Sequence, residues 1–462
     1  MRLNNRFILV LATAVSVAMS TSSCTSDRNE VELDYEAVEL LMLEKIIEAF
    51  YPNTYYQDQD DGFYVQPIDM SAKEGTPTNG GDGYWIRYNI MSQTLDGDIT
   101  NTRNATMAKQ LGSFNYKTRY TPAIQFITLD EDTTIDVIDY MCQSTDIVID
   151  GEITNVYAGN SFNLFAPSGL QGYLANGSGG YAGQTTMSTS ETMICEIEIT
   201  EVMDNIVNAE KASVDQFMAD NMDGDNEWVI VSKFKEYEED EEDYFEYDYE
   251  DDGFYDDDDY EDDYGIDDHD DDPDEEDHCI YVWVNQGYTP STKYNFTNPY
   301  PYQYLPDNYE NAEGFDYLES LVVAALEGLE LDEDENYADG TFELSTDEDD
   351  DIIDPETSAK IWYIARTLDG FIIDTNIEEV EDIVFGTESG GSAISYNPSY
   401  SGYSYIDAWY FGLIELRYGQ WASILTMSPY AYGIYGQTGS SSSTEIQPYT
   451  PLLFNVFIQK NE

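Results

Sequence analysis

The stretch that decides the fold is Tyr405–Gln459, which reads YIDAWYFGLIELRYGQWASILTMSPYAYGIYGQTGSSSSTEIQPYTPLLFNVFIQ. It contains the apolar run WASILTMSP, a loop rich in Tyr, Gly and Ser, and the closing run PLLFNVFIQ. Apolar and β-branched runs bounded by Gly, Pro and Ser are typical of strands joined by loops. This stretch therefore predicts two strands near the carboxyl end of the chain.

An earlier part of the chain repeats the same order of strand-like runs. The first series is GFYVQPI, YWIRYNI, FNLFAPS and ICEIEITEV, and the second is CIYVWVN, IWYIART, WASILTMSP and PLLFNVFIQ. The turn TLDG follows a strand in both series, at Thr94–Gly97 and at Thr367–Gly370. FAPSGLQGY in the first series likewise corresponds to LTMSPYAYG in the second. Such internal repetition predicts two copies of one fold.

The last hundred residues resemble the FKBP-type peptidyl-prolyl cis-trans isomerase family. In that family a short helix carries an apolar pair before Gly-Trp, and Gly-Gln, a strand, a loop with Pro and Ala-Tyr-Gly, and a Leu-x-Phe-x-Val strand follow. The matching segments cover most of residues 359–460, and YIARTLDGFIIDTN is similar to the family's preceding strand and turn. The resemblance implies an α+β protein with two FKBP-like domains, each an antiparallel sheet wrapped around a short helix, joined by a disordered acidic tract.

The resemblance also implies the domain boundaries. Residues 51–205 form a degenerate FKBP-like domain, and residues 279–462 form the isomerase domain, with an insertion at about 290–357 that includes a helix around Phe315–Leu329. Residues 206–278 form a linker and an Asp/Glu/Tyr-rich tract, with a short helix expected at Ala209–Met218.

Carried over residue by residue, the resemblance assigns Asp374, Trp409 and Tyr432 as catalytic residues. Trp409 would form the floor of a prolyl pocket, Asp374 would be its carboxylate, and the Tyr432 hydroxyl would donate to a substrate carbonyl. The chain departs from the family pattern at Ala408, where glycine is usual, and at two of the wall positions, which alters the shape of the pocket. The substrate-binding walls would be Tyr363, Ile373, Tyr405, Ile406 and Phe454.

The chemistry of this reaction explains why such residues suffice. Rotation about a peptide bond is opposed by an amide-resonance barrier of about 18–20 kcal/mol. An apolar pocket that excludes water, together with donors placed for the rotated amide, lowers that barrier. No nucleophile, metal or cofactor is needed, and the expected partners are unfolded or extended polypeptides that contain proline.

The first copy lacks the same constellation. Tyr88 and the TLDG turn are kept and Tyr173 lies near the place of the loop tyrosine, but Asn101 replaces the carboxylate. The helix position that should hold tryptophan falls at about Val148 or Ile149. We therefore expect the first domain to serve structure or client binding rather than isomerisation.

The amino terminus has the layout of a secretory signal. Arg2 and Arg6 precede an apolar run from Phe7 to Met19, and small residues lead to Cys24. A cysteine at the cleavage point predicts a lipoprotein held in the cell envelope by lipid on Cys24, at the outer membrane on its periplasmic or surface side. Thr21 stands where such signals usually have Leu, so a plain signal peptide with an incidental cysteine is the alternative.

Residues 25–50 read as a linker and an amphipathic helix, since Leu40, Leu43, Ile47 and Phe50 recur at helical spacing beside glutamates. We expect this helix to pack on the first domain. Pairing of two protomers through it is the alternative.

The charge of the chain excludes one class of partner. Asp and Glu number 94 against 18 Lys and Arg, a formal charge of -76, so nucleic acid and anionic membrane surfaces are repelled and only the N-terminal lipid should contact a membrane. A large share of the charge lies in residues 236–277. That tract cannot bury enough apolar surface to order itself, and we expect it to be disordered and to bind divalent cations weakly.

Two further features leave the function open. Export permits a disulfide between Cys142 and Cys195, but the odd number of cysteines after Cys24 and their distant spacing favour buried free thiols. The 40 tyrosines suggest an alternative function, a non-catalytic FKBP-like surface lipoprotein that binds a protein or a glycan.

Overall fold

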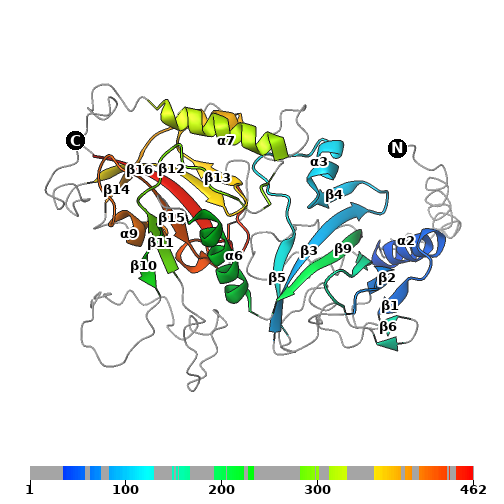
Figure 1. The fold of residues 1–462 in the computed structure, drawn as a ribbon. Helices are drawn as coiled ribbons and strands as arrows, with labels where there is room; N and C mark the ends of the chain where they lie inside the picture. Colours follow the sequence, from blue (N-terminus) through cyan, green and yellow to red (C-terminus); the bar gives the residue numbers. More distant parts are fainter. Residues whose placement is uncertain are drawn as a thin grey trace, which may run out of the picture. The chain divides into compact units, whose positions relative to one another are not determined.

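A computed structural model describes a large part of the chain. Contacts divide it into two units, Met1–Ile206 and Val207–Glu462, and each contains one seven-stranded sheet (Figure 1). The signal sequence with Cys24, the acidic tract, Cys142 and Tyr173 lie outside the described residues. The described residues are 35–57, 63–73, 83–128, 148–149, 152–153, 156–166, 192–203, 205–222, 227–233, 281–296, 298–300, 312–329, 358–386, 391–397, 405–433, 436–437 and 444–460.

The first unit is built on an antiparallel sheet of order β1-β2-β8-β9-β3-β4, with β5 paired to β3. A separate two-stranded ribbon, β6-β7, and two helices, α2 and α3, complete its described part. The bounds are α2 Tyr35–Phe50, β1 Tyr55–Gln57, β2 Phe63–Asp69, β3 Gly83–Thr94, β4 Ile99–Thr102, α3 Ala105–Leu111, β5 Ala123–Thr128, β6 Val148–Ile149, β7 Glu152–Ile153, β8 Ser161–Ala166 and β9 Met193–Met203.

The second unit is built on an antiparallel sheet of order β10-β11-β15-β16-β12-β13, with β14 paired to β12. Four α-helices and one short 3-10 helix, η3, accompany the described strands. The bounds are α6 Ile206–Asn221, β10 Val229–Lys233, β11 Tyr281–Asn285, α7 Ala312–Glu327, β12 Ala359–Thr367, β13 Ile372–Thr375, α8 Glu378–Phe385, β14 Ile394–Tyr396, α9 Asp407–Leu413, β15 Trp421–Thr426, η3 Ser428–Tyr430 and β16 Leu452–Lys460.

The two sheets have the same strand order, which confirms the α+β class and the internal repeat. Strands β2, β8, β9, β3 and β4 occupy the places of β11, β15, β16, β12 and β13. The TLDG turns also match: the glycine amide donates to the threonine carbonyl over 2.9 Å at Gly97 and 3.0 Å at Gly370. Both glycines have positive φ, 90° and 82°, which explains why glycine ends each turn.

The second sheet is buried on both faces. Alternate residues along its strands contribute to two apolar clusters, one that includes Trp409 of α9 and one that includes side chains of α6, α7 and α8. On β16 the side chains from Leu452 to Gln459 are all buried. On the matching β9, Glu196 and Glu198 are exposed between buried neighbours, and Thr200 is also exposed. The resemblance implied one short helix for each sheet, and helices were also expected at Ala209–Met218 and around Phe315–Leu329. These two are α6 and α7, which with α8 form a second helical layer on the opposite face.

Helix α6 differs from the expected linker at 206–278. Its residues Val214 and Phe217 are buried in the second unit's core, and its last residue, Asn221, exchanges hydrogen bonds with Asn295 (2.6 and 3.2 Å). β10 is also part of the sheet, since it pairs with β11. The segment before the acidic tract therefore belongs to the second unit's core.

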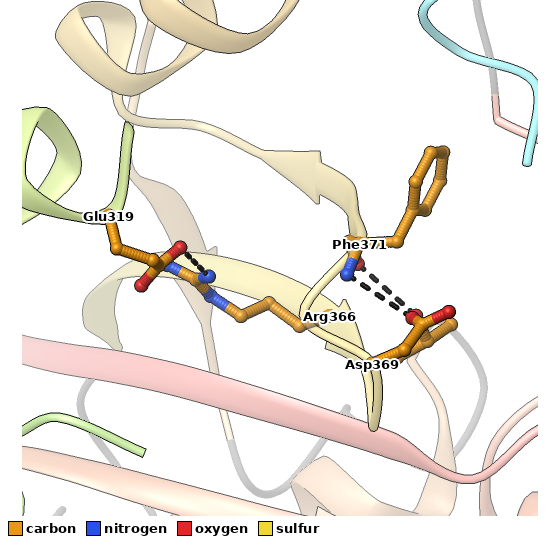
Figure 2. Close-up of polar contacts among 5 residues, drawn as sticks. Glu319, Arg366, Asp369 and Phe371 are labelled. Carbon is orange, nitrogen blue, oxygen red and sulfur yellow. Dashed lines mark hydrogen bonds and ion pairs between the residues drawn. The ribbon is translucent and has the colours of Figure 1, made fainter. Parts of the chain in front are cut away.

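Helix α7, which belongs to the predicted insertion, is joined to the second sheet by an ion pair. Arg366 of β12 donates from Nη1 to Glu319 Oε1 over 2.5 Å (Figure 2). The Arg366 side chain is 4% exposed and that of Glu319 is 25% exposed. Next to it, the Phe371 amide donates to Asp369 of the TLDG turn over 3.3 Å (Figure 2). The insertion thus contributes a helix that packs at this turn.

Helix α2 packs on the first sheet, as its amphipathic pattern predicts. Leu43 and Ile47 are buried against Phe165 and Ile194. Leu40, which the pattern places on the apolar face, is exposed instead.

Candidate functional site

Trp409 lies on α9, against the face of the second sheet that α9 covers. The helix begins after Ile406, whose extended backbone leaves its carbonyl to accept the Trp409 amide at 3.0 Å. Gly412 lets the helix approach β15 closely, because a Cβ at that position would stand 2.7 Å from Ile424 Cδ1. The Trp409 side chain is 4% exposed and is held by this close packing.

Three aromatic rings surround the Trp409 indole. Tyr363 of β12 and Phe454 of β16 meet it edge-on, with ring centroids 5.1 and 5.9 Å away at 76° and 84°. Tyr405 stacks on it at 5.6 Å and 19°, and its hydroxyl donates to the Ser395 carbonyl over 2.9 Å. Edge-to-face and offset-stacked pairs are the favoured geometries of aromatic contact. The indole therefore has a fixed orientation.

A tyrosine–carboxylate pair borders this aromatic cluster. The Tyr363 hydroxyl donates to Asp374 Oδ2 over 2.6 Å, and the Thr375 amide donates to Asp374 Oδ1 over 2.9 Å. Burial, and after it the charge of Asp374, raise the pKa of Tyr363. The phenol therefore stays protonated at physiological pH and keeps donating to a carboxylate that is itself exposed.

Tyr432 lies close to the same carboxylate. Burial raises the pKa of Tyr432, and the negative charge of Asp374 raises it further. The side chain is half-buried and packs against the cluster that contains Trp409. Its hydroxyl is thus kept as a neutral donor.

The structure brings all eight predicted site residues together. Four of them are buried, three are half-buried and Asp374 is exposed, so the cluster has a closed base and an accessible side. The buried four are Tyr363, Ile373, Trp409 and Phe454, and the half-buried three are Tyr405, Ile406 and Tyr432.

Asn376 is a supporting residue that the sequence analysis did not identify. Its Oδ1 accepts the Tyr363 amide at 2.8 Å, and its Nδ2 donates to the carbonyls of Ile361 (2.8 Å) and Ser392 (3.0 Å). These bonds fix the strand segment that carries Tyr363. Its only sequence signal is its place after the strand FIIDT, where asparagine commonly bonds to nearby backbone.

Strand register shows what the first unit has at the equivalent positions. Ser92 pairs with Asn101 just as Ala365 pairs with Asp374, which confirms Asn101 as the replacement of the carboxylate. In the ladder β3-β9, Ile90 pairs with Ile197, and in the ladder β12-β16, Tyr363 pairs with Val456. Ile90 therefore holds the position in the first unit that Tyr363 holds in the second.

Two expectations about the first unit are therefore wrong. Tyr88 lies two residues from the position of Tyr363, and its hydroxyl donates to Gln125 over 3.2 Å. Val148 and Ile149 form strand β6 rather than a helix. By the same register Cys195 occupies the position of Phe454, and burial raises the pKa of its thiol to about 11. At the three described positions equivalent to Tyr363, Asp374 and Phe454, the first unit thus has Ile90, Asn101 and Cys195 instead.

The described residues show two further absences. None of their His, Cys, Asp and Glu side chains form a group of three or more that could hold a metal ion. No helix within the described ranges is long and apolar enough to cross a membrane.

Comparison with known proteins gives distant structural neighbours. No protein-family model matches the chain, and no curated protein matches it. A peptidyl-prolyl cis-trans isomerase from Pseudomonas syringae pv. tomato is similar at 22% identity and a TM-score of 0.17, over 23% of this chain and 62% of that protein. The three FKBP domains of wheat FKBP73 are similar at 8% identity and a TM-score of 0.19, over 88% of this chain and 98% of that one. This chain thus covers less than two thirds of the Pseudomonas protein, and at these scores the function has to be argued from the site residues.

Proposed function

We propose that the second unit is a peptidyl-prolyl cis-trans isomerase of the FKBP type that acts on X-Pro bonds of exported proteins. The observation that supports this most strongly is the Trp409 indole held by three aromatic rings beside the Tyr363–Asp374 hydrogen bond. In this proposal the chain is anchored in the cell envelope through Cys24, and the first unit binds extended client chains.

The proposed mechanism uses only side chains of the second unit. The proline ring packs on the aromatic cluster from the side of Asp374, Tyr405 and Tyr432, which are the accessible members. Apolar packing removes water from the twisting amide, whose carbonyl loses resonance as it rotates. The Tyr432 hydroxyl donates to a substrate carbonyl, and Tyr363 holds Asp374 in place. Preorganised donors of this kind favour the rotated amide over the planar one.

We expect Asp374→Asn and Tyr432→Phe each to lower kcat/KM by roughly fivefold. Tyr432→Phe removes a hydrogen-bond donor, and Asp374→Asn removes the charge from a charge-assisted hydrogen bond, a loss of about 1 kcal/mol in each case. The measurement is a protease-coupled assay of a proline-containing tetrapeptide with the mature full-length chain. Asn101→Ala, at the position equivalent to Asp374 in the first unit, is the matched control and should leave kcat/KM unchanged.

The outcomes of this assay separate the two candidate functions. Equal activity in the wild type and both site variants would refute the assignment of Asp374 and Tyr432. A wild-type chain that lacks activity but binds an unfolded polypeptide or a glycan saturably would support the non-catalytic lipoprotein instead.

The pH dependence provides a separate prediction. An ordinary tyrosine loses its proton near pH 10, and burial together with the Asp374 charge raises the pKa of Tyr432 above that value. Activity that needs the Tyr432 proton should therefore persist through pH 10. In Asp374→Asn the loss should begin at lower pH, because a repelling charge no longer disfavours the phenolate. A protease-free fluorescence assay in alkaline buffers measures this, and identical alkaline limbs in both proteins would contradict it.

A further inference from the structure

Helix α6 carries a buried glutamate that is bonded to the loop leading to Tyr432. Glu210 is 2% exposed, and both of its carboxylate oxygens accept hydrogen bonds from Ser428. The Ser428 amide donates to Oε1 over 2.5 Å, and its hydroxyl donates to Oε2 over 2.7 Å. The two residues are 218 positions apart in the chain.

Ser428 in turn organises the loop that carries Tyr432. Its carbonyl accepts the amides of Ala431 and Gly433, both at 2.8 Å, so the backbone on either side of Tyr432 is tied to it. The Tyr432 carbonyl accepts the Gly436 amide at 3.0 Å. A shift of Ser428 would therefore be transmitted to Tyr432 through two short hydrogen bonds.

The contact between Glu210 of α6 and Ser428 of η3 is unusual for a helix whose role is only to pack against the core. Burying a carboxylate is unfavourable unless it is well hydrogen-bonded, and an apolar residue on α6 could pack on η3 without that cost. A carboxylate that accepts from both the amide and the hydroxyl of one serine fixes the orientation of that serine, because charge-assisted bonds are short and strong. The contact thus sets the position of η3 relative to α6.

We propose that Glu210 is a positioning residue of the isomerase, which holds the Tyr432 loop in its catalytic geometry through Ser428. The inference rests on the proposed function of the second unit. It makes α6, which lies outside the segment that resembles the family, a part of the site.

The test compares Glu210→Gln with Asp215→Asn in the full-length mature chain. Asp215 is an exposed residue of the same helix, paired with Lys211, so its variant makes the same chemical change away from Ser428. Glutamine keeps the size of the side chain but faces one Ser428 donor with its own NH₂ group. We expect kcat/KM on a proline-containing tetrapeptide to fall roughly fourfold for Glu210→Gln, close to the loss for Tyr432→Phe, because a displaced hydroxyl cannot cost more than an absent one. It should stay unchanged for Asp215→Asn.

A second background separates positioning from general damage to the fold. If Glu210 acts through Tyr432, Glu210→Gln should lower kcat/KM less than twofold when it is added to Tyr432→Phe. An equal fourfold loss in both backgrounds would overturn the inference. Full activity of Glu210→Gln, with the wild-type chain active, would also overturn it.

Amide hydrogen exchange tests the role of Glu210 in holding the loop separately from the proposed isomerase activity. The amides of Ala431 and Gly433 should exchange faster in Glu210→Gln than in Asp215→Asn, whatever the activity. Unchanged exchange there would overturn the role of Glu210, whereas an inactive wild type with the expected exchange would overturn catalysis and leave Glu210 as the residue that holds the loop.

Discussion

Trp409→Leu is expected to lower kcat/KM by roughly seventyfold, the largest loss of activity for any single substitution in the proposed site. A proline ring that packs on the aromatic cluster around the indole buries on the order of 100 Å² of apolar surface, most of it its own, worth about 2.5 kcal/mol at about 25 cal/mol per Å². Leucine does not offer the flat surface of the indole, and it cannot make the edge contacts with Tyr363 and Phe454 that orient the indole.

Because Trp409 is buried, its replacement also destabilises the second unit, and a matched variant is needed to separate the two effects. Trp283→Leu is that control, since Trp283 is also 4% exposed but lies in the cluster on the opposite face of the same sheet. We expect each variant to lose about 3 kcal/mol in the free energy of unfolding, near the lower end of the range for large aromatic residues cut to small ones. Only Trp409→Leu should lose activity at a temperature where both are folded. Equal activities would show that the indole is ordinary core and no part of a prolyl site.

Glu319→Ala is expected to lower the free energy of unfolding of the second unit by about 3–5 kcal/mol, because it removes a carboxylate that pairs with a buried guanidinium. Arg366 is the buried partner, and its guanidinium also lies 5.7 Å from the centre of the Phe296 ring. Urea denaturation followed by tryptophan fluorescence measures the effect, since five of the six tryptophans belong to this unit.

Asp316→Asn is the matched control for Glu319→Ala, because Asp316 is an exposed acidic residue on the same helix. It should change the free energy of unfolding by less than about 0.5 kcal/mol. The double variant Arg366→Met with Glu319→Leu should recover most of the stability, since well-packed apolar residues often replace a buried ion pair without loss. Equal urea midpoints for the Glu319 and Asp316 variants would show that α7 is not held by this ion pair.

The strands could be predicted from the sequence because each is an apolar run between turn residues. WASILTMSP and PLLFNVFIQ contain the strands β15 and β16, and the matching TLDG turns indicate the repeat from the sequence itself. The eight site residues could be predicted as one group because the motifs that carry them occur in a fixed order. Their mutual geometry could not, since it depends on the packing of α9 on the sheet.

Other features could not be predicted, for identifiable reasons. α3 and α8, at 7 and 8 residues, are too short for helical periodicity to be recognised. Tyr88 was misaligned because residues two apart on a strand share a face and the tyrosine was matched to a tyrosine. The distance to the TLDG turn, four residues from Tyr363 to Thr367 and from Ile90 to Thr94, agrees with the ladder register. The Glu210–Ser428 bond joins residues that no local pattern connects.

The place of β16 has a consequence for how the second unit is completed in a cell. This strand comes last along the chain, yet it lies between β15 and β12 near the middle of the sheet. A polypeptide that is made from its amino terminus can form hairpins from its earlier strands, but it cannot join them across this gap until β16 has been made. Folding of the second unit must therefore wait until β16 has been made, and removal of β16 would split the sheet in two rather than trim its edge.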